Sequence, residues 1–166
     1  MRNVVRRLPP KRTAETNQVT AKPVAVKRVY ETASRSDGTR VLVDRLWPRG
    51  LTKERAAVDH WLRDLAPSDA LRKWFHARHE IEAWPAFRRR YLKELADPEC
   101  AASIVQLYRL ANRRKKLTLL FASKNEKHNN AIVLRDLLEG MKKPPTGTGP
   151  GGVRAVRLRQ EKRMPR

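Results

Sequence analysis

Two short polar segments, each directly after a run of apolar residues, hold most of the side chains that could do chemistry. The first is DRLWPRG (44–50), after Val41–Val43, and the second is SKNEKHNN (123–130), after an apolar run that starts at Leu117. In an open parallel sheet, ligands bind beyond the carboxyl ends of the strands. If the two runs are neighbouring strands, the polar segments share one crevice and bring together Asp44, Arg45, Arg49, Lys53, Ser123, Lys124, Asn125, His128 and Asn129.

The basic and amide residues of this set suit an anion. Arginine presents a planar fork of donors that matches phosphate or carboxylate, and lysine adds a point charge. Residues 124–128 are expected to open a helix capped by Asn125, where free backbone N–H groups and the helix dipole favour negative charge. The sequence therefore predicts an anion-binding set made of Arg45, Arg49, Ser123, Lys124, Asn125 and Asn129.

Asp44 and His128 are the candidates for a catalytic role. Asp44 has several interpretations: it positions an arginine, acts as a general base, or forms a structural ion pair with Arg45. His128 either moves a proton or binds a ligand, or it is a structural residue in the first turn of the expected helix. Trp47 is expected to pack as a wedge on the following helix rather than to offer a stacking surface to a base.

The elements that must position these residues alternate between strands and helices. Strands are expected over 25–30, 41–46 and 117–123, with a turn at 34–40 that permits a hairpin between the first two. Helices are expected over 53–65, from Ser68 onward, and over 83–96, 98–112 and 126–139. This order implies parallel pairing. The predicted fold class is α/β, a small single layered domain with a largely parallel sheet flanked by helices.

Charge divides the chain of 166 residues into three parts. The formal net charge is +21, of which residues 1–25 carry +5 and residues 141–166 carry +7. We interpret these ends as a disordered basic N-terminal arm and a Gly/Pro/Arg-rich basic tail around an α/β domain at 26–140. Such charge attracts nucleic acid or a phosphorylated small molecule, although a merely solvated charged surface is the alternative.

The sequence predicts neither a metal site nor a cofactor. It has no Gly-rich phosphate loop, no Cys/His metal framework and no nucleophile elbow, and His76 and His79 lack further ligands at suitable spacing. The lone cysteine, Cys100, suits a reducing compartment, and no apolar run approaches the length of a membrane span. We therefore expect a cytoplasmic protein that does not enter membranes, while the oligomeric state is not predicted.

Two longer stretches carry a family resemblance. VLVDRLWPRGLTKERAAVDHWLRDLAPSDALRKWF (41–75) and LTLLFASKNEKHNNAIVLRDLL (117–138) resemble the YeaO-like bacterial proteins of the domain-of-unknown-function-488 family. The resemblance spans roughly 26–139 and implies a compact α/β domain with no established reaction. Many members look like His-Asn-His-Ala near position 128, whereas here Asn130 replaces the second histidine, and Asn125 replaces a usual acid. Roles that need two histidines or that carboxylate are therefore not expected.

Three functions remain open from the sequence. The first is a binding module for an anion or phosphate, with non-specific nucleic-acid affinity from the basic ends. The second is an enzyme acting on a phosphorylated or nucleotide-like substrate, in which Arg45 and Arg49 clamp the anion. The third is a non-catalytic structural or interaction protein whose polar cluster only stabilises the fold.

Overall fold

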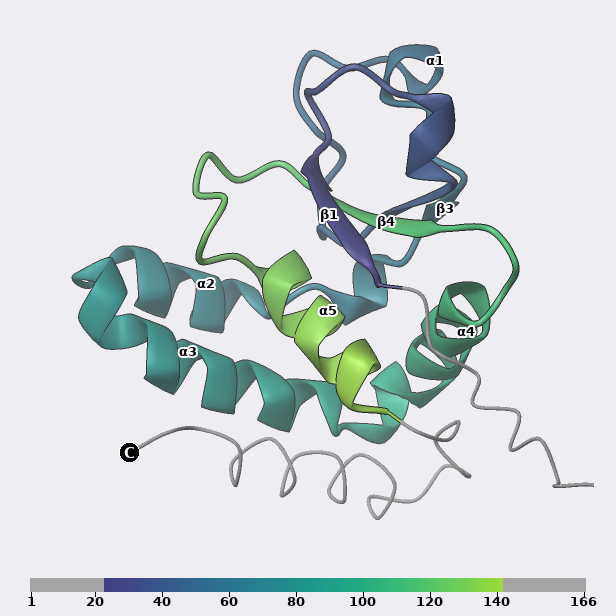
Figure 1. Ribbon diagram of the computed structural model, residues 1–166. Coiled ribbons are helices and arrows are strands. Elements are labelled where there is room, and N and C mark those ends of the chain that lie inside the picture. Colours follow the sequence, from purple (N-terminus) through teal and green to yellow (C-terminus); the bar gives the residue numbers. More distant parts are fainter. Residues whose placement is uncertain (1–22, 142–166) are drawn as a thin grey trace, which may run out of the picture.

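The structure is a computed structural model that describes residues 23–141. Apart from their innermost residues, the predicted arm at 1–25 and tail at 141–166 lie outside the described part, and they stay predictions. Within the described part, a parallel sheet is flanked by helices, which confirms the predicted α/β fold class (Figure 1).

The sheet has four strands in the order β1-β4-β2-β3, and every pairing is parallel. The strands are β1 (Ala25–Arg28), β2 (Thr39–Leu42), β3 (His60–Trp61) and β4 (Leu117–Phe121). The hairpin permitted between the first two strands is wrong, because β4 lies between β1 and β2 and pairs with both. The last strand in the sequence is therefore the centre of the sheet.

The apolar runs at Val41–Val43 and Leu117–Phe121 are buried on both faces of the sheet. Alternate residues point to opposite sides, as strand geometry requires. Val41, Leu119 and Phe121 join the large core cluster, whereas Leu42 and Leu120 pack in a smaller cluster with Val29 and Ala56. Burial on both faces explains why these strands read as continuous apolar sequence rather than as an alternating pattern.

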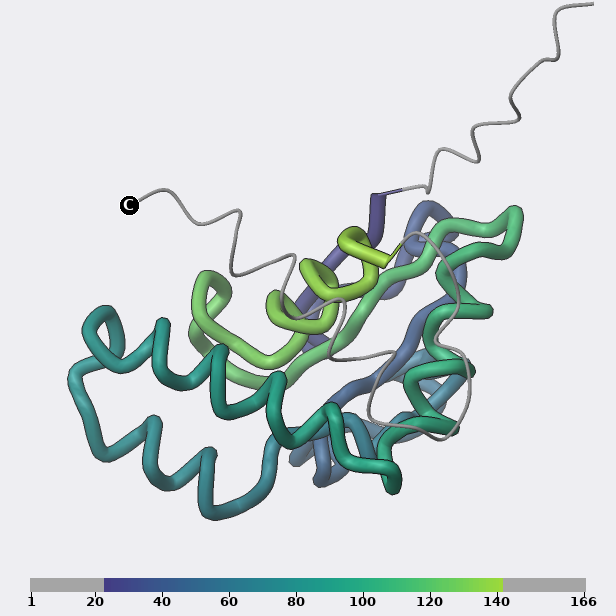
Figure 2. The backbone as a smooth tube through the Cα atoms, turned by 90° about the horizontal axis from the view of Figure 1, so that it is seen from below, coloured from purple at the N-terminus to yellow at the C-terminus, as the bar shows by residue number. Residues whose placement is uncertain are grey.

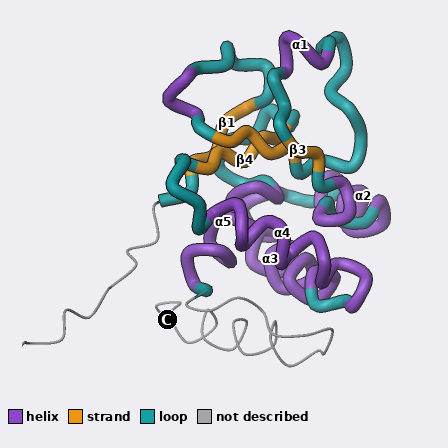
Figure 3. Tube along the Cα trace, turned by 90° about the vertical axis from the view of Figure 1, so that its right-hand side faces the viewer, coloured by secondary structure: helices purple, strands orange, loops and turns teal. Residues whose placement is uncertain are grey.

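The two faces of the sheet are covered unequally. Figures 1 and 3 show α2 to α5 together on one side and the short α1 on the other. Figure 1 shows α2 and α3 below the sheet, and Figure 2 shows them running side by side as an antiparallel pair. The helices are α1 (Lys53–Ala56), α2 (Asp69–His76), α3 (Glu80–Leu95), α4 (Ala101–Ala111) and α5 (Asn130–Gly140), with short 3-10 turns at Arg35–Asp37, Arg63–Leu65 and Pro98–Cys100.

The helix expected over 53–65 is wrong after its first turn. It ends at Ala56, and Ala57 adopts a left-handed conformation with φ 46°. The chain then turns to form β3 beside β2, where Asp59 N donates to Arg40 O at 2.9 Å and Asp59 Oδ2 accepts from Arg40 N at 2.8 Å. The apolar spacing in this segment fits a helix, but backbone pairing with the edge of the sheet overrides it.

The start of the last helix also differs from the expected one. We expected a helix over 126–139 capped by Asn125, but α5 begins at Asn130, and its cap is Asn129, whose side chain accepts from Ile132 N at 3.1 Å. Asn125 instead closes a tight turn, because its side-chain oxygen accepts from Lys127 N at 3.0 Å and His128 N at 2.9 Å. Both asparagines look like helix caps in the sequence, and only the second is one.

Candidate functional site

The chain segments that leave β2 and β4 line one cavity of about 700 Å³. The strands are parallel neighbours, so both segments leave the sheet at its carboxyl end. All the predicted anion-binding and catalytic candidates line this cavity, namely Asp44, Arg45, Arg49, Ser123, Lys124, Asn125, His128 and Asn129. Lys53 does not line it, because it is the first residue of α1. That these residues bind a ligand stays a prediction.

Asp44 joins the three elements that meet at the cavity. β2 ends at Leu42, two residues before it, so Asp44 belongs to the exit of the strand and not to the strand itself. Its Oδ2 accepts from Ala122 N, just past β4, at 2.7 Å, and its Oδ1 accepts from Asn130 Nδ2 at 3.3 Å. The structure has no ion pair between Asp44 and Arg45 within the described residues, so that structural interpretation is wrong.

Burial raises the pKa of Asp44 above its ordinary value of 3.8. The hydrogen bonds from Ala122 and Asn130, together with the positive charge of Arg72, act in the opposite direction and offset only part of this effect. Asp44 therefore lies in a partly dehydrated position where its charged form is less favourable than in water.

Asn130 is a functional candidate that the sequence reasoning did not include. It is buried at the first position of α5, and its Nδ2 donates to Val43 O at 2.8 Å as well as to Asp44. It therefore fixes both the exit of β2 and the orientation of the Asp44 carboxylate. The departure from the His-Asn-His-Ala pattern at this position was the available signal.

Three cations around the cavity have no partner in the described part of the chain. Among residues 23–141, the exposed side chains of Arg45, Arg49 and Lys124 make no hydrogen bond or ion pair. The backbone that carries them is nevertheless held in place. Arg28 Nε donates to Ser123 O at 2.9 Å beside Lys124, and the Tyr30 hydroxyl donates to Arg49 O at 3.2 Å.

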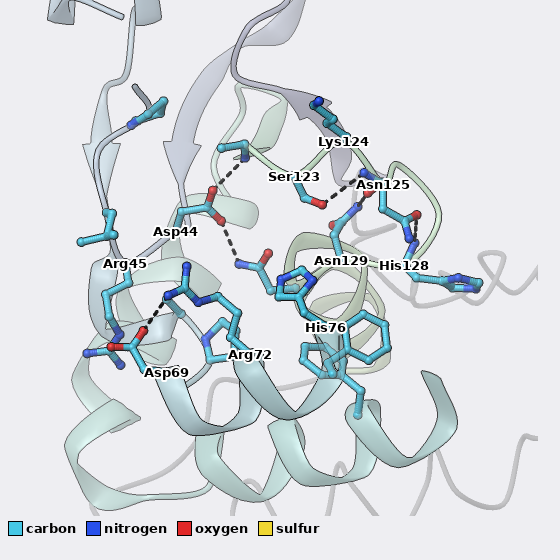
Figure 4. Close-up of a pocket in the computed structure, with 18 of the residues that line it drawn as sticks. Asp44, Arg45, Asp69, Arg72, His76, Ser123, Lys124, Asn125, His128 and Asn129 are labelled. Atoms are coloured by element: carbon cyan, nitrogen blue, oxygen red, sulfur yellow. Dashed lines mark hydrogen bonds and ion pairs between the residues drawn. The ribbon is translucent and has the colours of Figure 1, made fainter. Parts of the chain in front are cut away.

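Helix α2 supplies a third wall of the cavity, which the sequence reasoning missed. Figure 4 shows Arg72 and His76 projecting from α2 toward Asp44 and Asn129, with Asp69 beside Arg72. Arg72 Nη2 contacts Asp69 Oδ1 at 3.1 Å. The spacing of three and four residues between these side chains places them on one face of a helix. That polar stripe, next to the apolar face of α2, was the available signal.

His128 lies in the turn before α5, and not in the first turn of a helix as expected. Its Nδ1 is hydrogen-bonded to Glu80 Oε1 at the start of α3, and its ring contacts the Trp84 ring with centroids 4.7 Å apart. The hydrogen bond from His128 is the main cause that lowers the pKa of Glu80. Because one ring nitrogen is engaged, only Nε2 remains for another partner.

Trp47 packs as the expected wedge. It lies against the smaller core cluster, its Nε1 donates to Leu51 O at 2.7 Å, and its ring meets Trp61 edge-on at 5.4 Å. The indole of Trp61 in turn donates to Asp44 O at 2.7 Å. The two tryptophans therefore hold the turn at 44–50 in place, and one side of Trp47 also lines the cavity.

The described residues hold neither a cluster of metal ligands nor a helix that could span a membrane. In the range 23–141, no three His, Cys, Asp or Glu side chains lie together in a way that could hold a metal ion. The helices in the same range are all too short or too polar to cross a bilayer.

Comparisons with known proteins agree on the family. Residues 23–146 match the family model described as the inactive DUF488-N3 subclade. The uncharacterized protein YeaO of Escherichia coli K12 is 46% identical over 120 residues, which cover 71% of this chain and 98% of that protein. The uncharacterized protein Rv3073c of Mycobacterium tuberculosis H37Rv is 41% identical over 117 residues, or 70% and 94% of the two chains. No solved structure is significantly similar to this chain.

Proposed function

We propose a binding function rather than a catalytic one for this chain, which belongs to the inactive DUF488-N3 subclade of the domain-of-unknown-function-488 family. In this proposal the cavity binds a small anion, a phosphate group in particular. The basic arm and tail add non-specific affinity for nucleic acid, since Lys and Arg exceed Asp and Glu by 21 over the whole chain.

The observation that carries the proposal is the set of unpaired cations. Arg45, Arg49 and Lys124 line one cavity, and no described carboxylate pairs with them. Most other charges at the cavity are already engaged within the protein, as Arg72 is with Asp69 and Glu80 with His128. A bound phosphate would supply the missing counter-charge and would accept the forked donors of the arginines.

The contacts of Asp44 support a positioning role for this carboxylate. Both of its oxygens are already engaged within the protein, Oδ2 by Ala122 N and Oδ1 by Asn130 Nδ2. The description of the subclade as inactive supports the same conclusion. Asp44 in this proposal is a positioning residue that holds the exits of β2 and β4 together through Ala122.

The test is a calorimetric titration with inorganic phosphate. Full-length protein is compared with the Arg45→Gln, Arg49→Gln double variant and with Lys53→Gln, a matched control because Lys53 is exposed but outside the cavity. The double variant is expected to lose about tenfold or more in affinity, in line with the value of charge-assisted hydrogen bonds. Equal affinities for all three proteins would refute the proposal.

The nucleic-acid part of the proposal has its own test. Affinity of the full-length chain for DNA and RNA is measured at several salt concentrations. Because counterion release drives such binding, the logarithm of the association constant should fall steeply and linearly with the logarithm of salt. Absence of binding, or binding that salt does not weaken, would remove this part and leave the cavity proposal untouched.

One observation favours a second candidate, an enzyme acting on a phosphorylated or nucleotide-like substrate. The hydrogen bond between His128 and Glu80 leaves His128 Nε2 available as a proton donor or acceptor beside the cavity. A screen of phosphate esters for hydrolysis decides between the two functions. Turnover that His128→Gln abolishes would establish the enzyme, and no turnover with any ester that binds would establish the binding module.

A further inference from the structure

One wall of the cavity is aromatic and accessible to solvent. Tyr30 lines the cavity, and 44% of its surface is exposed, although aromatic side chains are usually more buried. Its hydroxyl is fixed by the bond to Arg49 O at 3.2 Å, and the guanidinium of Arg28 lies 5.4 Å from the ring centroid. The orientation of the Tyr30 ring is therefore fixed, and its hydroxyl bonds directly to the backbone of Arg49, one of the unpaired cations.

Further apolar surface lines the same cavity as this ring. Leu46 is 64% exposed, and it lines the same cavity as Trp47 and Pro67. Exposed apolar side chains that gather at a cavity indicate the place where the apolar part of a ligand packs. Since Arg45 and Arg49 lie in the same segment as Leu46, the cavity offers positive charge and apolar surface side by side.

The cavity is also lined by polar groups, which do not decide the kind of apolar group that fits. Asn129 and Asn130 contribute amides and Asp44 contributes a carboxylate to the lining of the cavity. Figure 4 shows Asp44 and Asn129 facing Arg72 and His76 of α2. The amides and the carboxylate are already hydrogen-bonded within the protein, so the choice of apolar group depends on the exposed surface beside them. That surface includes the ring of Tyr30, on which a flat heterocycle stacks and an alkyl chain does not.

We propose that the anion bound here is a nucleotide, with its phosphate on Arg45 and Arg49 and its base stacked on Tyr30. This inference rests on the proposed anion-binding function and adds the ligand class to it. The volume of about 700 Å³ lies within the range of about 300–1,000 Å³ that is usual for small-molecule sites. The nucleotide is either free or the terminal unit of a single strand, and the experiment distinguishes the two.

The first experiment compares four ligands by calorimetry on the full-length protein: inorganic phosphate, ribose 5-phosphate, butyl phosphate and nucleoside 5′-monophosphates. At least one nucleotide is expected to bind about tenfold or more tightly than ribose 5-phosphate, because stacking on an aromatic side chain contributes that much per base. Equal binding of nucleotides and ribose 5-phosphate overturns the inference but leaves anion binding intact. Stronger binding of butyl phosphate also overturns it, and binding of none of the four refutes the proposed function itself.

The second experiment assigns the stacking to Tyr30 through two variants. Tyr30→Phe keeps the ring and loses only the hydroxyl bond to Arg49 O, whereas Tyr30→Leu removes the ring. The ratio of nucleotide to ribose 5-phosphate affinity should survive in Tyr30→Phe and fall to about one in Tyr30→Leu. Because the basic arm and tail are present in both proteins, their contribution cancels in this ratio. A ratio that Tyr30→Leu leaves unchanged overturns the inference.

The third experiment distinguishes the two sources of the nucleotide. The same variants are titrated with a free mononucleotide and with a short 5′-phosphorylated single strand. Dependence on Tyr30 with the free mononucleotide identifies a small-molecule ligand, and dependence only with the strand identifies a nucleic-acid end. Dependence with neither overturns the inference.

Discussion

Asp37 lies just before β2 at the amino end of the sheet, and Asp44 lies just after β2 at the carboxyl end. The Asp37 carboxylate accepts from Ser34 N at 3.0 Å and from Lys27 Nζ at 3.2 Å, and it pairs with the Arg40 guanidinium. Arg40 is only 4% exposed, and its Nη2 and Nε donate to the backbone oxygens of Ala56 and Ala57 at 3.0 Å each.

The surroundings move the pKa of the two carboxyls in opposite directions. Burial acts to raise the pKa of Asp37, but the hydrogen bonds from Ser34, Lys27 and Arg40 outweigh it and bring the pKa below its ordinary value. At Asp44, burial outweighs the hydrogen bonds, and the pKa rises.

This difference separates a structural ionic cluster from a site. At the amino end each charge of the Lys27–Asp37–Arg40 cluster has partners inside the protein. At the carboxyl end, Arg45, Arg49 and Lys124 are left without any in the described residues. Charged side chains therefore stabilise the fold at the amino end of the sheet, and they lie unpaired at its carboxyl end. The carboxyl end is where parallel sheets bind ligands.

The strongest test of the comparison is Asp37→Asn. Removing this carboxylate leaves the buried guanidinium of Arg40 without a counter-charge, and such a change costs about 3–5 kcal/mol of unfolding free energy. Urea denaturation of the full-length chain measures it. Arg35→Gln in the same 3-10 turn is the control, because Arg35 is exposed. A loss below about 1 kcal/mol would mean that the cluster is not structural.

A smaller loss is expected for Asp44→Ala. Ala122 N and the Asn130 amide each lose an acceptor, which costs about 1–3 kcal/mol in total because the cavity lets water replace part of the bonding. The affinity for phosphate should rise rather than fall, since a negative charge leaves the cavity. Denaturation and calorimetry on the same variant measure the two effects. A drop in phosphate affinity would show instead that the way Asp44 holds the exits of β2 and β4 matters more for binding than its charge.

The pH dependence of stability should have opposite signs at the two ends. The Asp37 pKa is lower in the folded state, so the stability that Asp37 contributes is present above pH 3.8 and is lost as pH falls through its folded pKa. The Asp44 pKa is higher in the folded state, so its contribution is present below pH 3.8 and is lost as pH rises through its folded pKa. Denaturation of wild type, Asp37→Asn and Asp44→Asn between pH 3 and 6 provides the measurement. If the change in unfolding free energy varied with pH in the same direction for both variants, the proposed electrostatic difference between Asp37 and Asp44 would be wrong.

The smallest stability effect is expected for the Arg45→Gln, Arg49→Gln double variant. Exposed side chains without partners contribute little, so the unfolding free energy should change by less than about 0.5 kcal/mol. Together with the loss of phosphate binding proposed above, this result would separate function from stability at the carboxyl end. A loss of more than about 1 kcal/mol of unfolding free energy would show that these arginines stabilise the fold.

The convergence of Asp44 and Ser123 was predicted from two buried runs and the rule for parallel sheets, on the condition that the two strands are neighbours. The pairing of β2 with β4 meets that condition. The polar stripe that carries Arg72 and His76 is visible in the sequence, but its place at the cavity was not predictable, because that place depends on how α2 docks beneath the sheet. The start of α5 was ambiguous for a chemical reason, since Asn125 and Asn129 are both suitable caps. The 53–65 segment misled because its apolar residues serve a helix or an edge strand equally well.

The central position of β4 also bears on how the protein is made. The ribosome releases β1 and β2 first, and each lacks its main sheet neighbour until Leu117–Phe121 emerges, roughly 10 s later at usual rates of translation. During that interval Val41 and Leu42 have only the two-residue β3 to pair with, so the nascent chain carries an apolar strand edge that chaperones would recognise. Mutations that slow the arrival or docking of β4 should therefore reduce yield in the cell more than they reduce the stability of the finished protein.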